Sequence, residues 1–218
     1  MGMTMKAKAS AERVEANSAD LLLDATSALM IERNTVDVTF VEIAQKSGLN
    51  AALIRYHFGS KLGMFMALLE RDAGPTFDDL ERLVQSDMDA AQKLRHHVHG
   101  IIKVYFRYPY MNRLVAALAV ETDSETARFI SERFSRPLAN AQKAILEQGE
   151  AEGLFRKLDP MLFYFSLVGA CDHLFNARHS LKYAFGIEDI DDDLRRAYAA
   201  HVTGILMRSV LVQPEIEA

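Results

Sequence analysis

The sequence predicts an all-α protein of one or two domains. Apolar residues recur every three or four positions along most of the chain, which is the period of an amphipathic helix. The 218 residues include only 11 glycines and five prolines, and most of these stand where helices would end. No alternation of apolar and polar residues persists long enough to indicate a strand.

The composition argues against several classes of protein. The single cysteine, Cys171, rules out an intrachain disulfide and a zinc site built from several cysteines. No run of about 18 apolar residues occurs, so we expect no membrane-spanning segment and no membrane partner. Residues 1–10 carry two lysines with no apolar stretch behind them, which is unlike a secretory signal and predicts a disordered basic arm. We therefore expect a cytoplasmic protein.

Four helices are predicted in the first third of the chain, over about residues 11–33, 40–47, 51–57 and 61–71. Thr39, with Glu42 three residues later, matches a capping box at the start of the second helix. Gly48 is expected to end that helix in a left-handed conformation. Asn50 and Ser60 are expected to cap the third and fourth helices, because short polar side chains accept hydrogen bonds from free backbone N–H groups.

Further helices are predicted over about residues 76–86, 90–107, 109–120, 125–151, 160–184 and 192–212. Gly74-Pro75 is expected to end or kink the helix before it, and Pro137 to kink the long helix that contains it. The helix over 160–184 is apolar on most sides, which predicts that it is buried on several sides.

Charge is distributed unevenly along the chain. The 25 basic and 30 acidic residues give a net charge of −5. Residues 1–71 contain eight of each sign and sum to zero, so residues 72–218 carry the whole excess of acid. Within residues 39–61, three bases against one acid give +2. Any contact with nucleic acid is therefore expected to be local to this segment.

Residues 39–61 form the most specific segment of the sequence. A short helix, a glycine-led turn and a second short helix make a helix-turn-helix. Ala44 is small where two helices must cross closely, and Gly48 permits the backbone of the turn. The residues left facing outward on the second helix are small or form hydrogen bonds, which suits entry into a major groove: Asn50, Ala51, Ala52, Arg55 and Tyr56.

This segment resembles the DNA-binding domain of the TetR family of transcriptional repressors. The resemblance extends over about residues 14–71 and is carried by Thr39, Ile43-Ala44, Gly48-Leu49, Tyr56-His57-Phe58 and Ser60-Lys61. It implies a helix-turn-helix domain over 11–58, a connecting helix over 59–73 and a ligand-binding and dimerisation domain over 74–218. It also implies a repressor that a small molecule releases from a palindromic operator.

The resemblance assigns roles at the DNA residue by residue. Asn50, Ala51, Ala52 and Arg55 would face the major groove, and Thr39, Tyr56, His57 and Lys61 would meet the phosphate backbone. The two alanines depart from the family, which more often has a hydrogen-bonding residue at one of these positions. Arg55 is therefore expected to carry more of the base readout, and DNA shape to matter more than usual.

The resemblance also implies an effector pocket and a homodimer in the C-terminal domain. The helices over about 90–120 and 160–180 would line the pocket, with Tyr105, Phe106, Arg107, Met111, Arg113, Tyr164, Val168 and His173 as candidates. Their character suits an aromatic or acyl-like ligand, with Arg107 or Arg113 holding an anion. Core packing and solvent-facing arginines remain the alternative interpretation. The dimer would form through the last two helices, over about 160–184 and 192–212.

Two other clusters suggest chemistry but favour ordinary structural roles. His96 and His99 share a helix face with no carboxylate or cysteine beside them, so no metal site is predicted there. Cys171 and His173 flank Asp172, but neighbouring helical residues point about 100° apart and cannot converge on one atom. We predict no catalytic residue, metal or cofactor. The alternative functions are a helical partner-binding protein and an enzyme that uses the region of Cys171 and His173.

Overall fold

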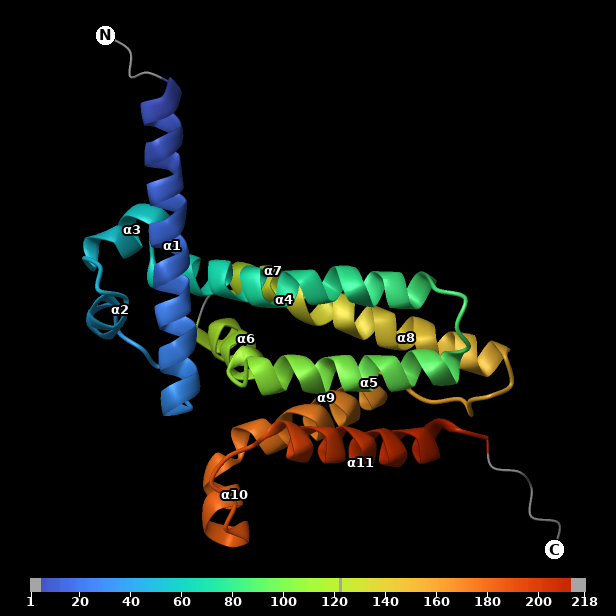
Figure 1. The fold of residues 1–218 in the computed structure, drawn as a ribbon. Helices are drawn as coiled ribbons and strands as arrows, with labels where there is room; N and C mark the ends of the chain where they lie inside the picture. The colour runs from blue at the N-terminus through green and yellow to red at the C-terminus, as the bar shows by residue number, and fades with distance from the viewer. Residues whose placement is uncertain (1–4, 122, 213–218) are drawn as a thin grey trace, which may run out of the picture. The chain divides into compact units, whose positions relative to one another are not determined.

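The computed structural model describes residues 5–121 and 123–212, and most of this length is helical (Figure 1). Its elements are α1 (Met5–Arg33), α2 (Phe40–Ser47), α3 (Ala52–Phe58), α4 (Lys61–Gln85), α5 (Ala90–Arg107), α6 (Met111–Glu121), α7 (Ser124–Ile130), a π-helical turn (Ser131–Ser135), α8 (Arg136–Ala151), α9 (Pro160–Asn176), α10 (Arg178–Phe185) and α11 (Asp192–Val210). The chain forms two compact units, and the boundary between them falls after Asp72, within α4. Among the described helices, none is both long and apolar enough to cross a membrane.

The first unit, up to Asp72, packs α2 and α3 against α1. Leu22 of α1, Ile43 of α2 and Ile54 of α3 are completely buried. Each such side chain contributes about 1.5–3 kcal/mol when it leaves water. Met64 and Leu68, in the first turns of α4, are also completely buried. The short helices α2 and α3 therefore derive their stability from this shared core.

The predicted helix caps are largely confirmed. The Thr39 side chain accepts from the backbone N–H of Glu42, and the Glu42 carboxylate accepts from the backbone N–H of Thr39, which completes the capping box. Gly48 has the left-handed φ of 70° that the turn after α2 requires. The side chain of Asn50 accepts from the backbone N–H of Ala52 at 2.8 Å. The hydroxyl of Ser60 accepts from the backbone N–H of Gly63 at 3.0 Å.

The predicted bounds of two helices were wrong. Helix α1 begins at Met5, so residues 5–10 are helical where a disordered arm was expected, and residues 1–4 lie outside the described part. Helix α4 does not end at Gly74-Pro75 but continues to Gln85. Buried residues continue along α4 through Ala73 to Leu80 at helical spacing, so packing outweighs the cost of an internal proline.

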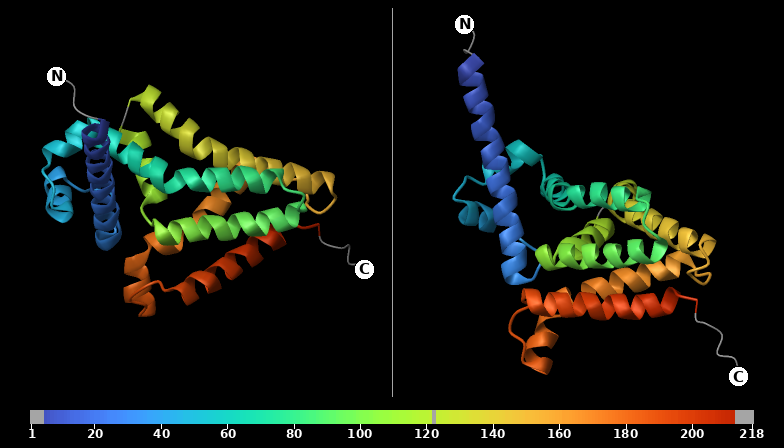
Figure 2. Two further views of the ribbon diagram at one scale, coloured as in Figure 1. Left: turned by 45° about the horizontal axis from the view of Figure 1, so that its top comes forward. Right: turned by 45° about the vertical axis from the view of Figure 1, so that its right-hand side comes forward.

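The second unit is built around α5, which packs against α8, α9 and α11 (Figures 1 and 2). Both figures show α5 between α8 on one side and α11 on the other. Its buried residues recur every three or four positions along the whole helix: Ala90, Lys93, Leu94, His97, Val98, Ile101, Ile102 and Tyr105. This wide buried face explains why α5 is the central helix of the unit.

Two predicted single helices are each divided. A π-helical turn at Ser131–Ser135 separates α7 from α8 directly before Pro137, whose missing N–H and ring disfavour a regular preceding turn. The expected kink is therefore a change of helix type N-terminal to the proline. The helix expected over 160–184 is interrupted at Ala177. Beyond this point only Leu181 is buried in α10, so little packing holds it in line with α9.

Candidate DNA-binding head and effector cavity

The first unit, up to Asp72, is called the head below. Its helix α3 presents an open surface. Asn50, Ala52, Arg55 and Tyr56 are exposed, and Ala51 is half-buried. Ile54 lies on the opposite side of the helix and is completely buried, so it anchors α3 to the core. The guanidinium of Arg55 makes no ion pair in the described part of the chain and points into solvent from a fixed helix.

Three of the residues predicted to contact the phosphate backbone of DNA have close neighbours in the same unit. The Thr39 hydroxyl donates to the Glu42 carboxylate at 2.8 Å. The Ser18 hydroxyl and Nε2 of His57 lie 2.8 Å apart, which ties α3 to α1. Nζ of Lys61 lies 3.7 Å from the Asp37 carboxylate and 5.4 Å from the centre of the Phe65 ring.

The Glu42 carboxylate organises the entrance to α2. Hydrogen bonds from the backbone and side chain of Thr39, followed by one from Arg33, lower the pKa of Glu42 to about 2. Nη1 of Arg33 lies 2.5 Å from this carboxylate. The carboxylate therefore stays ionised at neutral pH and keeps accepting the hydrogen bond from the Thr39 backbone N–H that caps the first turn of α2.

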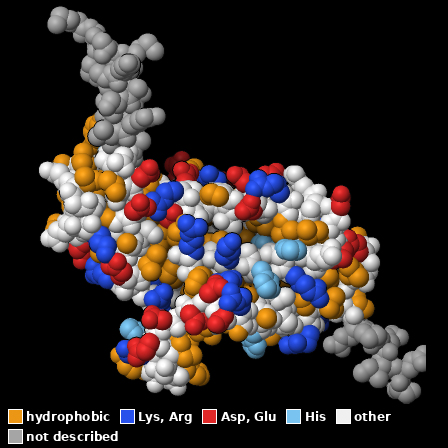
Figure 3. Space-filling model, viewed as in Figure 1, with side chains coloured by type: hydrophobic (Ala, Val, Ile, Leu, Met, Phe, Trp, Pro, Cys, Tyr) orange, Lys and Arg blue, Asp and Glu red, His pale blue; other side chains and the backbone are white. Residues whose placement is uncertain are grey.

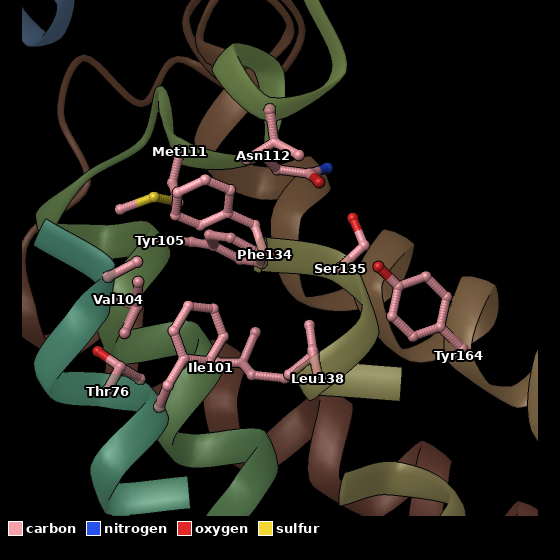
Figure 4. Close-up of a pocket in the computed structure, with 13 residues that line it drawn as sticks. Thr76, Ile101, Val104, Tyr105, Met111, Asn112, Phe134, Ser135, Leu138 and Tyr164 are labelled. Carbon is pink, nitrogen blue, oxygen red and sulfur yellow. The ribbon is translucent and has the colours of Figure 1, made fainter. Parts of the chain in front are cut away.

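The second unit contains a cavity of about 80 Å³ between its helices (Figure 4). Its walls come from the second half of α4, from α5 and α6, from the π-helical turn, and from α8 and α9. The lining residues are mostly apolar or aromatic: Ala73, Thr76, Phe77, Ile101, Val104, Tyr105, Met111, Asn112, Val115, Phe134, Ser135, Leu138 and Tyr164. Such a concave, largely apolar site with a few polar groups is typical of small-molecule binding.

Three of the predicted pocket residues line this cavity, namely Tyr105, Met111 and Tyr164. Arg107, Arg113, Val168 and His173 do not line it, so this cavity does not support their assignment to an effector pocket, which stays a prediction. Arg107 is exposed and lies over the Tyr108 ring. Val168 is buried and His173 is exposed, because two residues five positions apart on α9 point to different faces of the helix.

Arg113 and Phe106 do not line the cavity and contact other residues of the second unit. Arg113 is half-buried close to Asp172, and burial lowers its pKa while Asp172 opposes that change. The Phe106 ring packs edge-on against Phe175 and has Arg195 above it. Neither arginine proposed as an anion holder therefore stands on the cavity wall.

The residues that the sequence interpretation missed come from two segments. Thr76 and Phe77 lie on α4 beyond Pro75, where a helix end had been expected. Phe134 and Ser135 belong to the π-helical turn before Pro137. The period from Ala73 through Phe77 to Leu80 was the available signal for a continuous α4.

A buried carboxylate stands behind the polar part of the wall. Asn112, which lines the cavity, donates through Nδ2 to the Asp172 carboxylate at 3.0 Å, and Asn176 donates to the same oxygen. Burial raises the pKa of Asp172, and the two asparagines and Arg113 partly oppose this. Burial, followed by the nearby Asp172, raises the pKa of Tyr105 well above its ordinary value. The wall is therefore polar at this place without carrying a charge of its own.

The catalytic alternative finds no support in the geometry of α9. The Cys171 thiol is completely buried, and burial followed by Asp172 raises its pKa to about 12. Asp172 is bonded to two asparagines, and His173 is exposed. The three side chains therefore do not meet at one point.

The histidines of α5 differ in their surroundings. His97 is buried, whereas His96 and His99 are exposed on the helix. On the face of the second unit that Figure 3 draws, histidine side chains lie among basic and acidic ones. Among the described residues, no group of three or more His, Cys, Asp or Glu side chains is arranged to hold a metal ion.

An apolar surface covers part of α9 and α11. The two helices run antiparallel side by side, and the Tyr198 hydroxyl donates to the backbone carbonyl of Ala170 (Figures 1 and 2). On α9, Leu162 and Phe165 are 61% and 66% exposed, and on α11 Ile205 is 45% exposed. The helix after residue 160 was predicted to be buried on several sides, but Leu162 and Phe165 are exposed in a single chain.

Comparison with known proteins matches both units. The family described as "Tetracyclin repressor-like, C-terminal domain" matches residues 87–215, and "Bacterial regulatory proteins, tetR family" matches residues 22–68. The HTH-type transcriptional repressor NicS of Pseudomonas putida is 25% identical over 167 residues, which cover 74% of this chain and 77% of NicS.

Two solved structures share the fold. The transcriptional regulator FadR of Bacillus subtilis, in complex with stearoyl-CoA, has a TM-score of 0.65 at 18% identity and covers 87% of this chain and 97% of its own. A transcriptional regulator of Saccharomonospora viridis, in complex with choline, has a TM-score of 0.68 at 17% identity and covers 91% of this chain and all of its own. With both domain families matched, the chain belongs to the TetR family and is a DNA-binding transcriptional regulator.

Proposed function

We propose that the protein is a homodimeric repressor that binds a palindromic operator and leaves it when a small molecule fills the cavity of the second unit. In this proposal residues 11–58 bind DNA, residues 59–73 connect, and residues 74–218 bind the effector and form the dimer. The observation that carries it is the open face of α3, where Arg55 projects from a helix anchored by Ile54. A helix that enters a major groove needs this combination of fixed backbone and free side chains.

The dimer follows from the same requirement. Two heads that read a symmetric operator must stand about 34 Å apart, which needs a second copy of the chain. The exposed side chains of Leu162, Phe165 and Ile205 supply an apolar surface for that copy. A Cβ added at Gly169 of α9 would meet no other atom, which leaves room there for close approach of a helix backbone.

The cavity is proposed as the effector site. NicS is named a repressor, and the two similar structures contain stearoyl-CoA and choline, so proteins of this fold hold small molecules. Helix α4 begins with Lys61 in the head and lines the cavity with Thr76 and Phe77 in its second half. A ligand that favours a different position of α4 would shift the population away from the DNA-competent state, with a coupling of about 1–3 kcal/mol.

The test is selection of genomic DNA by the purified protein, followed by affinity measurements on the best fragment at two salt concentrations. A palindromic site whose affinity falls steeply with salt is the expected result. If no site is enriched, either before or after unfolding and refolding to remove a co-purified ligand, the DNA-binding proposal is contradicted.

Replacing Arg55 with alanine is expected to reduce operator specificity by about 1–3 kcal/mol, which is the worth of a bidentate contact with guanine. The measurement is the affinity ratio between the operator and a scrambled fragment. Arg128, which is exposed on α7, provides the matched control as Arg128→Ala. An unchanged ratio in R55A would remove the base-reading role of Arg55.

Replacing Lys61 with alanine is expected to weaken binding to all DNA sequences alike and to make the salt dependence shallower by roughly one counterion. The measurement is the slope of log affinity against log salt concentration. Lys143→Ala is the control, because Lys143 pairs with Glu147 at 3.6 Å much as Lys61 pairs with Asp37 at 3.7 Å. A slope equal to that of the wild type would show that Lys61 does not neutralise a phosphate.

A further inference from the structure

The walls of the cavity carry no charged side chain. Its 13 lining residues are apolar, aromatic, hydroxyl-bearing or amide-bearing, and none is Lys, Arg, His, Asp or Glu. A charged ligand group that enters such a site loses its hydration without gaining a partner, which costs several kcal/mol. The lining therefore favours a ligand whose buried part is uncharged.

The ionisable groups behind the wall do not change this preference for an uncharged ligand. Asp172 does not line the cavity, and it is hydrogen-bonded to Asn112, which does. Arg113 lies close enough to Asp172 for each to shift the pKa of the other, so the two charges oppose each other. No single-sign field is therefore directed into the cavity that would select an anion or a cation.

Three polar groups lie toward one end of the cavity. Figure 4 shows the amide of Asn112 and the hydroxyls of Ser135 and Tyr164 directed to the same end, beside the aromatic rings. Within the described chain, the hydroxyls of Ser135 and Tyr164 make no hydrogen bond. They are therefore available to a ligand as donors or acceptors.

Asp172 determines which atom Asn112 offers. The Asn112 amide nitrogen donates one of its two hydrogens to the Asp172 carboxylate, which orients the amide and leaves its carbonyl oxygen as an acceptor. Asp172 is itself more than nine-tenths buried, and its Oδ1 has no hydrogen-bond partner in the described chain. Asn112 therefore presents an acceptor, and the matching ligand group is a donor.

The size of the cavity limits the ligand. An apolar cavity of about 150 Å³ accommodates benzene in a well-packed protein. The cavity here is about 80 Å³, so it takes one ring or a short branched chain, and only with some widening. The aromatic side chains Phe77, Phe134 and Tyr164 suit stacked or edge-on contacts with such a ring.

We propose that the effector is an uncharged molecule of about one ring that carries a hydroxyl or N–H group, which donates a hydrogen bond to the side-chain oxygen of Asn112. This inference rests on the proposed function only in taking the cavity as the effector site. It assigns Asn112 as the specificity-determining residue and Asp172 as the residue that positions it.

The test is calorimetric binding of four matched probes to the full-length protein: benzyl alcohol, benzyl methyl ether, benzoate and benzylammonium. Benzyl alcohol is expected to bind at least about tenfold more tightly than benzoate and benzylammonium, which corresponds to about 1.4 kcal/mol. It is also expected to bind more tightly than the ether, which has the ring and oxygen but no donor. Equal or tighter binding of a charged probe, or no binding of benzyl alcohol, would overturn the inference.

A variant locates the binding to the cavity. Asn112→Leu is expected to abolish the preference for benzyl alcohol over the ether, whereas Asn140→Leu, on the exposed side of α8, is expected to preserve it. The comparison of probes on the wild type stands even if N112L does not fold. Operator affinity without ligand is measured in parallel: its absence contradicts the proposed function, while the order of probe affinities still decides the inference.

Discussion

Replacing Phe165 with aspartate is expected to convert the protein from a dimer to a monomer and to weaken operator binding at least about 100-fold, or about 3 kcal/mol. Phe165 is 66% exposed on α9 in the single chain, and its ring packs edge-on against Tyr164 of the same helix. A large aromatic side chain at the centre of an interface is a typical hot spot. An aspartate there would place an unpaired carboxylate in the apolar contact between the two copies.

Sedimentation equilibrium gives the oligomeric state, and titration with an operator and with a half-site gives the DNA affinities. The half-site affinity is expected to stay unchanged, because the head is not altered. Phe129→Asp is the matched control, since Phe129 is 54% exposed on α7. A dimeric F165D variant with full operator affinity would show that the face of α9 and α11 is not the interface.

Replacing His97 with leucine is expected to remove a large part of the acid sensitivity of the fold. His97 is 3% exposed, and its burial lowers its pKa from 6.5 to about 4. Between these values the unfolded chain binds a proton that the folded protein does not bind, so the free energy of unfolding decreases as the pH falls. Below about pH 4 both states are protonated and this contribution stops changing.

The expected size of this effect is roughly 3 kcal/mol between pH 6.5 and pH 4. The measurement is the free energy of unfolding by urea, at fixed protein concentration, over this range for the wild type and H97L. The Nε2 atom of His97 has no hydrogen-bond partner in the described chain, so leucine removes no bond there. His96→Leu, an exposed neighbour on α5, is expected to keep the wild-type slope. Parallel curves for wild type and H97L would contradict the assignment of this acid sensitivity to His97.

Local signals predicted the head correctly. The capping box of Thr39 and Glu42, the left-handed Gly48 and the buried Ile54 of α3 all depend on neighbours within a few residues. The resemblance of this segment then pointed to a family that the two domain matches show. Which residues of the head touch DNA stays a prediction, with Arg55 and Lys61 as its direct tests.

The cavity was predicted only in part. Tyr105, Met111 and Tyr164 were found because their helices were correctly expected and their side chains suit a pocket. Phe77 was missed because Pro75 was read as a helix end, although buried residues of α4 continue past it. Arg113 was expected in the pocket but does not line this cavity, and the sequence does not show whether a half-buried arginine faces a cavity or a buried carboxylate such as Asp172.

The helical class, the helix caps around residues 39–60 and the helix-turn-helix could be predicted from the sequence alone. Caps, turn glycines and apolar period act through contacts within about one turn, so they can be read from neighbouring residues. Only the tertiary structure decided the continuity of α4, the break between α9 and α10, and the residues around the cavity. These features arise from packing between helices that are far apart in the chain. That packing can outweigh the local preference of a proline and selects which face of each helix meets the cavity.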